Sequence, residues 1–248
     1  MCGRFVLKAP PEEIKALFQY TDDPVFPARY NIAPTQPVGI VRQESRQRRF
    51  ALARWGLVPS WVKDLQDFTL LTNARSETAL AKPSFRDSMK HFRCLIPVSG
   101  FYEWKREDGH KTPYYIYPRQ GGVIAFAGLW SRWMNAEGSE LDSVAILTRA
   151  ANGTVGEIHH RMPCVILPDD SNRWLDVQNV TAKEAAKILR PLQDDFFDKV
   201  PVSTRVNRVI HDDPELTEKV EPAHREFPKK KRVQHPDQIG GGGQLDLF

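Results

Sequence analysis

The sequence is poor in cysteine and has no long hydrophobic run. Three of its 248 residues are cysteine, which is an odd number, and no secretory signal is recognisable. A disulfide framework needs paired cysteines in an oxidising compartment, so we expect reduced thiols in a cytoplasmic protein. The longest apolar runs fall far short of the about 20 residues that span a membrane, so we expect no membrane segment.

Metal-binding patterns, internal repeats and regular strand–helix–strand alternation are also missing. The spacing of Cys2, Cys94 and Cys164 matches no metal-binding pattern, and no cofactor motif is recognisable. We therefore expect neither a metal nor a cofactor. Cys94 and Cys164 each lie in an apolar run, which favours buried structural thiols.

The composition fits one large domain with a sizeable core. Hydrophobic residues make up 41% of the chain, and the formal net charge is +4. A mildly basic protein can bind an acidic partner but does not require one.

Short stretches typical of strands recur along the chain, separated by a few helical segments. Helices are predicted from Pro10, from Pro83 and over 181–189, the last with a capping box. Residues 29–34 are interpreted as a loop and residues 201–210 as extended. The expected strands cover residues 38–42, 49–58, 94–98, 101–105, 114–117, 123–130, 144–148 and 165–167. The pattern predicts an α+β domain with a mostly antiparallel, curved or barrel-like sheet and peripheral helices.

The character of the sequence changes after about Val220. We expect one domain over residues 2–220 and a tail over 221–248, which contains a basic run at 229–232 and four glycines at 240–243. The apolar end of this tail either docks back onto the domain or is a tethered docking peptide. We favour the docking peptide, because a flexible glycine linker is not needed for docking back.

Cys2 is the most distinctive residue of the chain. Removal of Met1 would leave Cys2 with an α-amine and a thiol on adjacent carbons. Such a 1,2-aminothiol attacks acyl carbons, or condenses with an aldehyde to an imine that the thiol closes into a thiazolidine ring. The apolar continuation Gly3-Arg4-Phe5-Val6 would carry Cys2 into the core, whereas an accidental terminal cysteine would lie on a frayed end.

Three polar residues are further candidates for chemistry. Asn73 follows an apolar stretch, Glu103 lies between aromatic residues, and His159 stands in Glu157-Ile158-His159-His160-Arg161. A buried carboxyl such as that of Glu103 can move protons near neutral pH. Taken singly, each also fits a structural role, as a turn cap, a solvent-facing strand residue and a loop histidine.

Arginines alternate with aromatic residues along the chain. Arginine neutralises phosphates, and aromatic rings stack on unpaired bases, so the set fits single-stranded nucleic acid as well as surface arginines around core tryptophans. The set comprises Arg4, Arg29, Arg54, Arg75, Arg161, Arg205, Arg208, Trp55, Trp61, Tyr102 and Trp104.

Six blocks, in order over about residues 2–210, together resemble one family. They are Met1-Cys2-Gly3-Arg4-Phe5, Arg29–Pro34, Arg54–Trp61, Asn73–Thr78, Gly100–Lys105 and Ile158–Pro163. The chain is similar here to the SRAP family of SOS-response-associated, abasic-site-processing proteins. The resemblance implies binding of abasic sites in single-stranded DNA, a covalent thiazolidine crosslink through Cys2, weak lyase activity and self-removal of Met1.

The resemblance also implies roles for single residues. Cys2 would supply amine and thiol, Glu103 would move protons at the amine and imine, and His159 would assist opening of the deoxyribose ring. Asn73 would orient Cys2 or the sugar. The implied DNA contacts are phosphate binding by Arg4, Arg75 and Arg161 and stacking or wedging by Trp61.

The tail resembles the pentapeptide by which bacterial repair proteins bind the sliding clamp. Leu247 and Phe248 would fill an apolar pocket with Leu245 beside them, and Gln244 would anchor by hydrogen bonds. We expect a monomer associated with the bacterial nucleoid. Two alternatives remain open from the residues alone: an N-terminal-nucleophile cysteine hydrolase of amides, and a non-catalytic clamp-associated adaptor.

Overall fold

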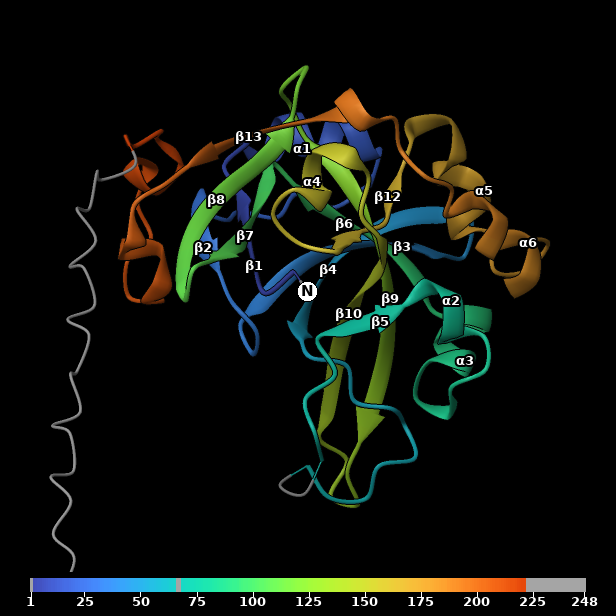
Figure 1. Ribbon diagram of the computed structural model, residues 1–248. Helices are drawn as coiled ribbons and strands as arrows, with labels where there is room; N and C mark the ends of the chain where they lie inside the picture. The colour runs from blue at the N-terminus through green and yellow to red at the C-terminus, as the bar shows by residue number, and fades with distance from the viewer. Residues whose placement is uncertain (1, 66–67, 222–248) are drawn as a thin grey trace, which may run out of the picture.

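A closed barrel of five strands forms the centre of the protein. The computed structural model describes residues 2–65 and 68–221 (Figure 1). Each barrel strand pairs with the next in the order β10-β4-β3-β6-β9, and β9 pairs with β10 again to close the ring. Among the five barrel strands, only the β10–β4 pairing is parallel. The barrel strands are β3 (Pro37–Glu44), β4 (Gln47–Trp55), β6 (Arg93–Val98), β9 (Ile124–Met134) and β10 (Glu140–Ala150).

Three short strands extend the barrel sheet. β5 (Asn73–Arg75) and β11 (Arg161–Pro163) both pair with β10, and β12 (Val165–Ile166) pairs with β9. The sequence blocks around Asn73 and His159 therefore both lie beside strand β10 of the barrel.

A second, five-stranded sheet packs beside the barrel. Its order is β13-β8-β7-β1-β2, and all its pairings are antiparallel. Phe101 of this sheet packs edge-on against Phe126 of the barrel at 5.8 Å between ring centroids. The strands are β1 (Arg4–Leu7), β2 (Arg29–Ile32), β7 (Gly100–Glu107), β8 (His110–Pro118) and β13 (Phe197–Pro201).

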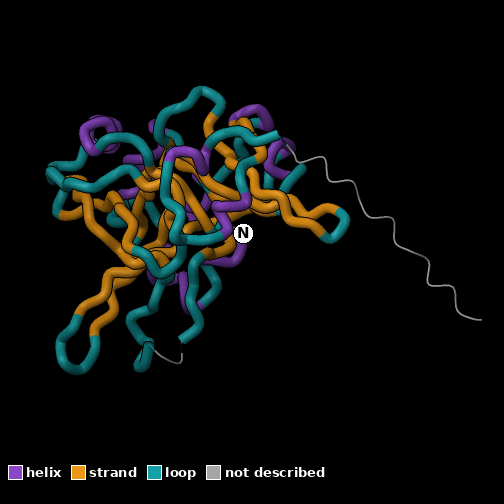
Figure 2. Tube along the Cα trace, turned by 90° about the vertical axis from the view of Figure 1, so that its left-hand side faces the viewer, coloured by secondary structure: helices purple, strands orange, loops and turns teal. Residues whose placement is uncertain are grey.

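The helices are short and lie around the strand-rich centre (Figure 2). They are α1 (Pro11–Phe18), α2 (Ser76–Ala79), α3 (Pro83–His91), α4 (Gly153–Gly156), α5 (Ser171–Leu175) and α6 (Ala182–Ile188), with 3-10 turns η1 (Pro168–Asp170), η2 (Asp194–Phe196), η3 (Thr204–Asn207) and η4 (Pro214–Thr217). In the described parts of the chain, no helix has the length and apolar character needed to cross a membrane.

Local sequence explains where two of the helices begin. Pro11 opens α1, whose buried side carries Ile14 and Phe18. Before α6, the Thr181 side chain accepts a hydrogen bond from Glu184 N, and the Glu184 carboxylate accepts one from Thr181 N over 2.9 Å. The predicted capping box and the α+β class with a barrel-like, mostly antiparallel sheet are confirmed.

Three of the sequence-based assignments are wrong. Residues 29–32 form strand β2 because they pair with β1, with Ile32 opposite Phe5. Residues 201–210 are not extended throughout: Thr204–Asn207 form η3, and the Ser203 side chain accepts from Arg205 N at its start. The strand predicted over 49–58 ends at Trp55, before Gly56 at φ +135°, a backbone conformation that favours glycine.

Candidate active site

Cys2 lies fully buried two residues before the start of strand β1. Its backbone carbonyl accepts a hydrogen bond of 2.9 Å from Asn73 Nδ2, and its thiol donates to the Arg4 carbonyl over 3.7 Å. The apolar strand that follows carries Cys2 into the core, as the sequence suggested for Gly3–Val6. A frayed position for Cys2 is therefore wrong.

Asn73 holds Cys2 from the first position of β5. This strand runs parallel to β10, with Asn73 opposite Ile146. Asn73 Nδ2 also donates to Thr72 Oγ1 over 3.1 Å, which fixes the plane of the amide. Its Oδ1 is buried and has no hydrogen-bond partner among the described residues. The amide thus orients Cys2 and leaves one acceptor for a further donor.

Glu103 and His159 meet from two different elements. Glu103 lies on β7 and is buried, and its Oε1 is 3.8 Å from His159 Nδ1. His159 follows α4, where its backbone N–H donates to Val155 O, and Arg161 N–H donates to His159 Nδ1 over 3.1 Å. These backbone bonds fix the position of the imidazole beside the carboxylate.

The thiol of Cys2 is held in its protonated form. Burial raises the pKa of Cys2 well above its usual range, and the negative charge of Glu103 raises this pKa further. The thiol must therefore lose its proton during a reaction rather than before it. Glu103 is the side chain whose charge acts on this thiol, and His159 Nδ1 lies 3.8 Å from Glu103 Oε1.

Helix α4 is anchored at its first residues by the segment before β13. Asn152 Oδ1 caps the helix by accepting from Val155 N, and Asn152 Nδ2 donates to Gln193 O. Gly153 N donates to Asp194 Oδ1 over 2.5 Å. Since His159 follows this helix directly, the 193–194 segment supports its position.

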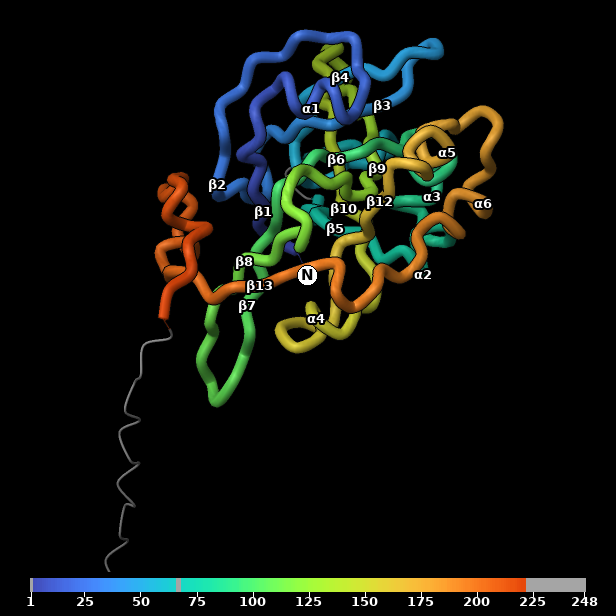
Figure 3. The backbone as a smooth tube through the Cα atoms, turned by 90° about the horizontal axis from the view of Figure 1, so that it is seen from above, coloured from blue at the N-terminus to red at the C-terminus, as the bar shows by residue number. Residues whose placement is uncertain are grey.

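An open cavity of about 840 Å³ lies over Glu103 and His159. Figure 3 shows the hairpin of β7 and β8 projecting from the body of the protein beside α4. Strand β1 pairs with β7 only as far as Tyr102, so the cavity lies along the part of β7 that β1 leaves uncovered. Its lining residues are Glu103, Trp104, Arg106, Lys111, Gly156, Ile158, His159, His160 and Asn207.

The predicted DNA-contacting arginines differ in what they already bind. Arg4 donates to Asn31 Oδ1, Val206 O and Asn207 O. Arg161 forms a bidentate pair with Glu77, with Nη1 at 2.6 Å from Oε1.

Arg75 is different, because it is exposed and has no carboxylate partner in the ranges that the structure describes. The predicted wedge, Trp61, is 55% exposed and packs edge-on against Phe68. Of these four side chains, Arg75 and Trp61 are the ones most open to a ligand.

Sequence reasoning did not single out four residues around this site, of which two are the asparagines Asn31 and Asn207. Asn31 is fully buried and donates to the carbonyls of Val206, Arg208 and His211, which fastens the 204–211 segment beside β2. Asn207 of that segment accepts from Trp104 Nε1 over 2.8 Å and lines the cavity.

Arg106 and Lys111 were also missed, although the sequence carries a signal for them. The Asp108-Gly109 turn between two strand-like runs indicates a hairpin, which places these two residues opposite each other. The predicted clamp-binding residues Gln244, Leu245, Leu247 and Phe248 lie outside the described residues.

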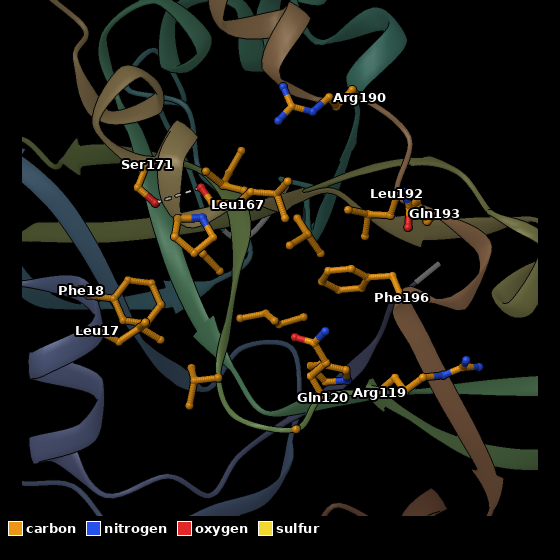
Figure 4. Close-up of a pocket in the computed structure, with 18 of the residues that line it drawn as sticks. Leu17, Phe18, Arg119, Gln120, Leu167, Ser171, Arg190, Leu192, Gln193 and Phe196 are labelled. Atoms are coloured by element: carbon orange, nitrogen blue, oxygen red, sulfur yellow. Dashed lines mark hydrogen bonds between the residues drawn. The ribbon is translucent and has the colours of Figure 1, made fainter.

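A second cavity, of about 830 Å³, contains none of the predicted site residues (Figure 4). It lies between the end of α1, the loop after β8 and the segment that leads to β13. Its wall is partly apolar, with Phe18, Leu167, Leu192 and Phe196 pointing into it in Figure 4.

The chain is similar to a set of known proteins over almost its whole described length. The family model for SOS response associated peptidase (SRAP) matches residues 1–209. The abasic site processing protein YoqW of Bacillus subtilis is 35% identical over 222 residues, which cover 88% of this chain and 99% of YoqW. The abasic site processing protein YedK of Escherichia coli is 31% identical over 230 residues, 89% of this chain and 100% of YedK.

A solved structure shows the same fold. A protein of Bacteroides thetaiotaomicron superposes with a TM-score of 0.80 at 25% identity, covering 89% of this chain and all of that one.

Proposed function

Because the chain belongs to the SOS response associated peptidase family, we propose that it binds abasic sites in single-stranded DNA and joins them covalently through Cys2. The observation that supports this best is the position of Cys2. It is buried, held by Asn73, and lies within the electrostatic reach of Glu103. A 1,2-aminothiol in such a setting has a defined direction of attack and a carboxylate close by.

The proposed reaction joins the processed Cys2 to C1′ of the open-chain sugar. The α-amine adds to the aldehyde carbon, and loss of one water gives an imine. The Cys2 sulfur then adds to the imine carbon while the imine nitrogen takes up a proton, which closes the five-membered thiazolidine. The balance is one aminothiol plus one aldehyde giving one thiazolidine plus one water, with no oxidant or reductant.

Proton transfer is the task proposed for Glu103 and His159. The raised pKa of the Cys2 thiol means that the sulfur attacks as its proton leaves, so a nearby base lowers the barrier. Glu103 is proposed as that base, and as the group that carries protons at the amine and imine. His159, 3.8 Å from Glu103, is proposed to donate to the ring oxygen of the sugar as the ring opens.

The DNA contacts are proposed according to the partners that each side chain has in the structure. Arg75 and Trp61 are exposed, so we propose Arg75 as a phosphate ligand and Trp61 as a stacking or wedging residue. Arg4 already donates to Asn31, and Arg161 already donates to Glu77. Only the remaining N–H groups of these two arginines can bind a phosphate. Their larger contribution is proposed to be the placement of β1 and β11 at the site.

Three finer activities are also part of the proposal. An imine at C1′ allows β-elimination, so we propose weak strand scission at abasic sites. Exposure of the Cys2 amine requires loss of Met1, which we propose the protein itself promotes. We also propose that Gln244–Phe248 binds a bacterial sliding clamp, on the ground of its sequence alone. Loss of clamp binding on deletion of these five residues, with crosslinking unchanged, is the expected result.

The test of the proposed function is a crosslinking assay with two matched oligonucleotides. We expect a covalent adduct with a single strand that carries one abasic site. We expect none when the same aldehyde is first capped with methoxyamine, because the amine then has no carbonyl carbon to attack. An adduct that forms equally well with the capped site would contradict the proposal, and turnover of a small amide instead would favour the hydrolase alternative.

A further inference from the structure

The hairpin of β7 and β8 carries two basic residues directly opposite each other. Arg106 on β7 pairs in register with Lys111 on β8, so both side chains extend from the same face of the hairpin. Like charges in this arrangement repel, and the repulsion destabilises the free hairpin. An anion bound between the two side chains would remove that cost.

Among the described residues, neither cation is neutralised. Within residues 2–65 and 68–221, no carboxylate forms an ion pair with Arg106 or Lys111, and both are exposed. The neighbouring Lys105, on the other face of the same strand, pairs with Glu107 at 3.1 Å. The hairpin therefore has one face with a neutralised charge and one face with two free positive charges.

The face with free charges borders the cavity over the candidate active site, whereas Glu103, by the alternation of the strand, lies on the opposite face of β7. Trp104 lies two positions before Arg106 on the same face of the strand, and its indole N–H is bound to Asn207. Trp104, Arg106 and Lys111 line the same cavity as Glu103 and His159. A fixed indole followed by two cations is the arrangement by which proteins follow a single nucleic-acid strand.

We infer that Arg106 and Lys111 bind the phosphate backbone of the single strand on one side of the abasic site. The inference rests on the proposed function and adds the path of the DNA away from the reacting sugar. A single strand fits this part of the cavity better than a duplex, because exposed bases can stack on an aromatic side chain such as Trp104. The same two side chains do not touch C1′, so they contribute to binding and not to the chemical step.

The test measures how binding depends on salt. The probe is a single strand with a stable tetrahydrofuran analogue of the abasic site, and the variant is Arg106→Gln/Lys111→Gln. Each lost phosphate contact reduces the slope of log K against log salt by about 0.7 for single strands. We expect a slope reduced by about 0.7–1.4, so that the affinity lost between about 50 and 200 mM salt shrinks by a factor of about 3–7.

Two control variants separate this site from general loss of charge. Lys105→Gln removes a cation from the same strand that Glu107 already neutralises. Lys90→Gln/Lys183→Gln removes two cations from the side of the molecule that carries α3 and α6, away from the hairpin in Figure 1 and Figure 3. We expect both controls to keep the slope of the unchanged protein within about 0.3.

A third variant distinguishes a binding role from a structural one. Arg106→Glu replaces the repelling pair by an opposite-charge pair with Lys111, so we expect a raised melting temperature together with weaker DNA binding. Oligonucleotides that lack nucleotides on one side of the lesion show which flank is bound. The effect of Arg106→Gln/Lys111→Gln should disappear with one truncation and persist with the other.

Two results would overturn the inference that Arg106 and Lys111 bind DNA. Equal salt slopes for the unchanged protein and Arg106→Gln/Lys111→Gln would show that the hairpin does not bind DNA, as would an effect that survives removal of both flanks. Failure of the unchanged protein to crosslink an abasic strand would instead refute the proposed function.

Discussion

Two cavities of this protein, the one over Glu103 and His159 and the one in Figure 4, are nearly equal in volume and differ in their charges. The cavity over Glu103 and His159 is bordered by Arg106 and Lys111, which have no carboxylate partner in the described ranges.

The cavity of Figure 4 has three arginines around it, and each is already bound by the protein. Arg48 donates to Phe18 O and Asn172 Oδ1, Arg119 pairs with Asp198, and Arg190 pairs with Asp170 at 2.8 Å.

The comparison shows that volume alone does not identify the reactive cavity. A buried ionisable group is costly to a free protein, and such groups cluster at functional sites. Only the first cavity combines buried Glu103, the neighbouring thiol of Cys2 and free cations among the described residues. The predictions below follow from that difference.

The largest effect is expected from removal of the Cys2 thiol. Cys2→Ala loses the sulfur that closes the ring, so the stable adduct with an abasic single strand should fall to background in a denaturing gel. Cys94→Ala is the matched control, because Cys94 is also a fully buried thiol but lies in β6. Full adduct formation by Cys2→Ala would show that the Cys2 sulfur is not needed for the crosslink.

The next largest effect is expected from Glu103→Gln. Loss of a positioned acid or base slows a reaction by about 10²–10⁴-fold, so crosslinking at saturating DNA should slow within that range. Glu157→Gln is the control, since Glu157 is an exposed carboxylate paired with Lys199. Equal rates for the two variants would show that Glu103 transfers no proton.

Glu103→Gln should also change the acidity of the thiol. The negative charge of Glu103 raises the pKa of Cys2, so its removal lowers that pKa toward the ordinary value. The thiolate fraction at a given alkaline pH then increases, and alkylation of Cys2 by iodoacetamide should become faster at that pH. Mass spectrometry of the labelled peptide measures this rate, and a slower reaction would contradict the assigned cause.

A smaller effect is expected from Asn73→Ala. This change removes the hydrogen bond to the Cys2 carbonyl, and a net loss of about 0.5–1.5 kcal/mol corresponds to a rate about 2- to 12-fold lower. Binding of the tetrahydrofuran strand should be unchanged, because Asn73 acts through the position of Cys2. A loss of affinity without a loss of rate would assign Asn73 to the DNA instead.

The Glu77–Arg161 pair should affect stability only modestly and only above acidic pH. The hydrogen bond from Arg161 lowers the pKa of Glu77 to about 2, so the pair stabilises the fold fully above about pH 4.5 and loses this contribution as the pH falls toward 2. Glu77 is half exposed, so solvent screens the pair. Urea unfolding should show Glu77→Gln less stable than the unchanged protein at pH 7, with the difference smaller at pH 3.

The smallest effect is expected at the cavity of Figure 4. Arg119 and Arg190 are neutralised by Asp198 and Asp170, so Arg119→Gln/Arg190→Gln should leave the salt slope of DNA binding unchanged. Arg106→Gln/Lys111→Gln in the same assay is the positive comparison. A reduced slope for the Arg119→Gln/Arg190→Gln variant would move the DNA path to the second cavity.

Local patterns of sequence predicted much of the fold. The capping box at Thr181, the proline at the start of α1 and most strands depend on neighbours in sequence, and the structure confirms them. Strand β2 was missed because it is stabilised by pairing with β1, which the local sequence does not show. The turn η3 was missed because Asn31, over 170 residues earlier, fastens the segment around it.

The sequence predicted which residues form the site but not how their side chains are arranged. The motif blocks pointed to Cys2, Asn73, Glu103 and His159, and the structure places them just before β1, on β5, on β7 and in the loop after α4. Sequence alone did not show that Arg161 binds Glu77, or that Arg106 and Lys111 face each other without a counterion. Those facts depend on which side chains meet across strands.

The most direct test of the account is the mass of the adduct peptide after digestion of the crosslinked complex. The account predicts that the amino-terminal peptide begins at Cys2 and carries the opened sugar, with a mass equal to peptide plus sugar less one water, and with no free thiol on Cys2. A sugar attached to a lysine, to Cys94 or to Cys164, or a peptide that still begins with Met1 in the crosslinked fraction, would contradict it.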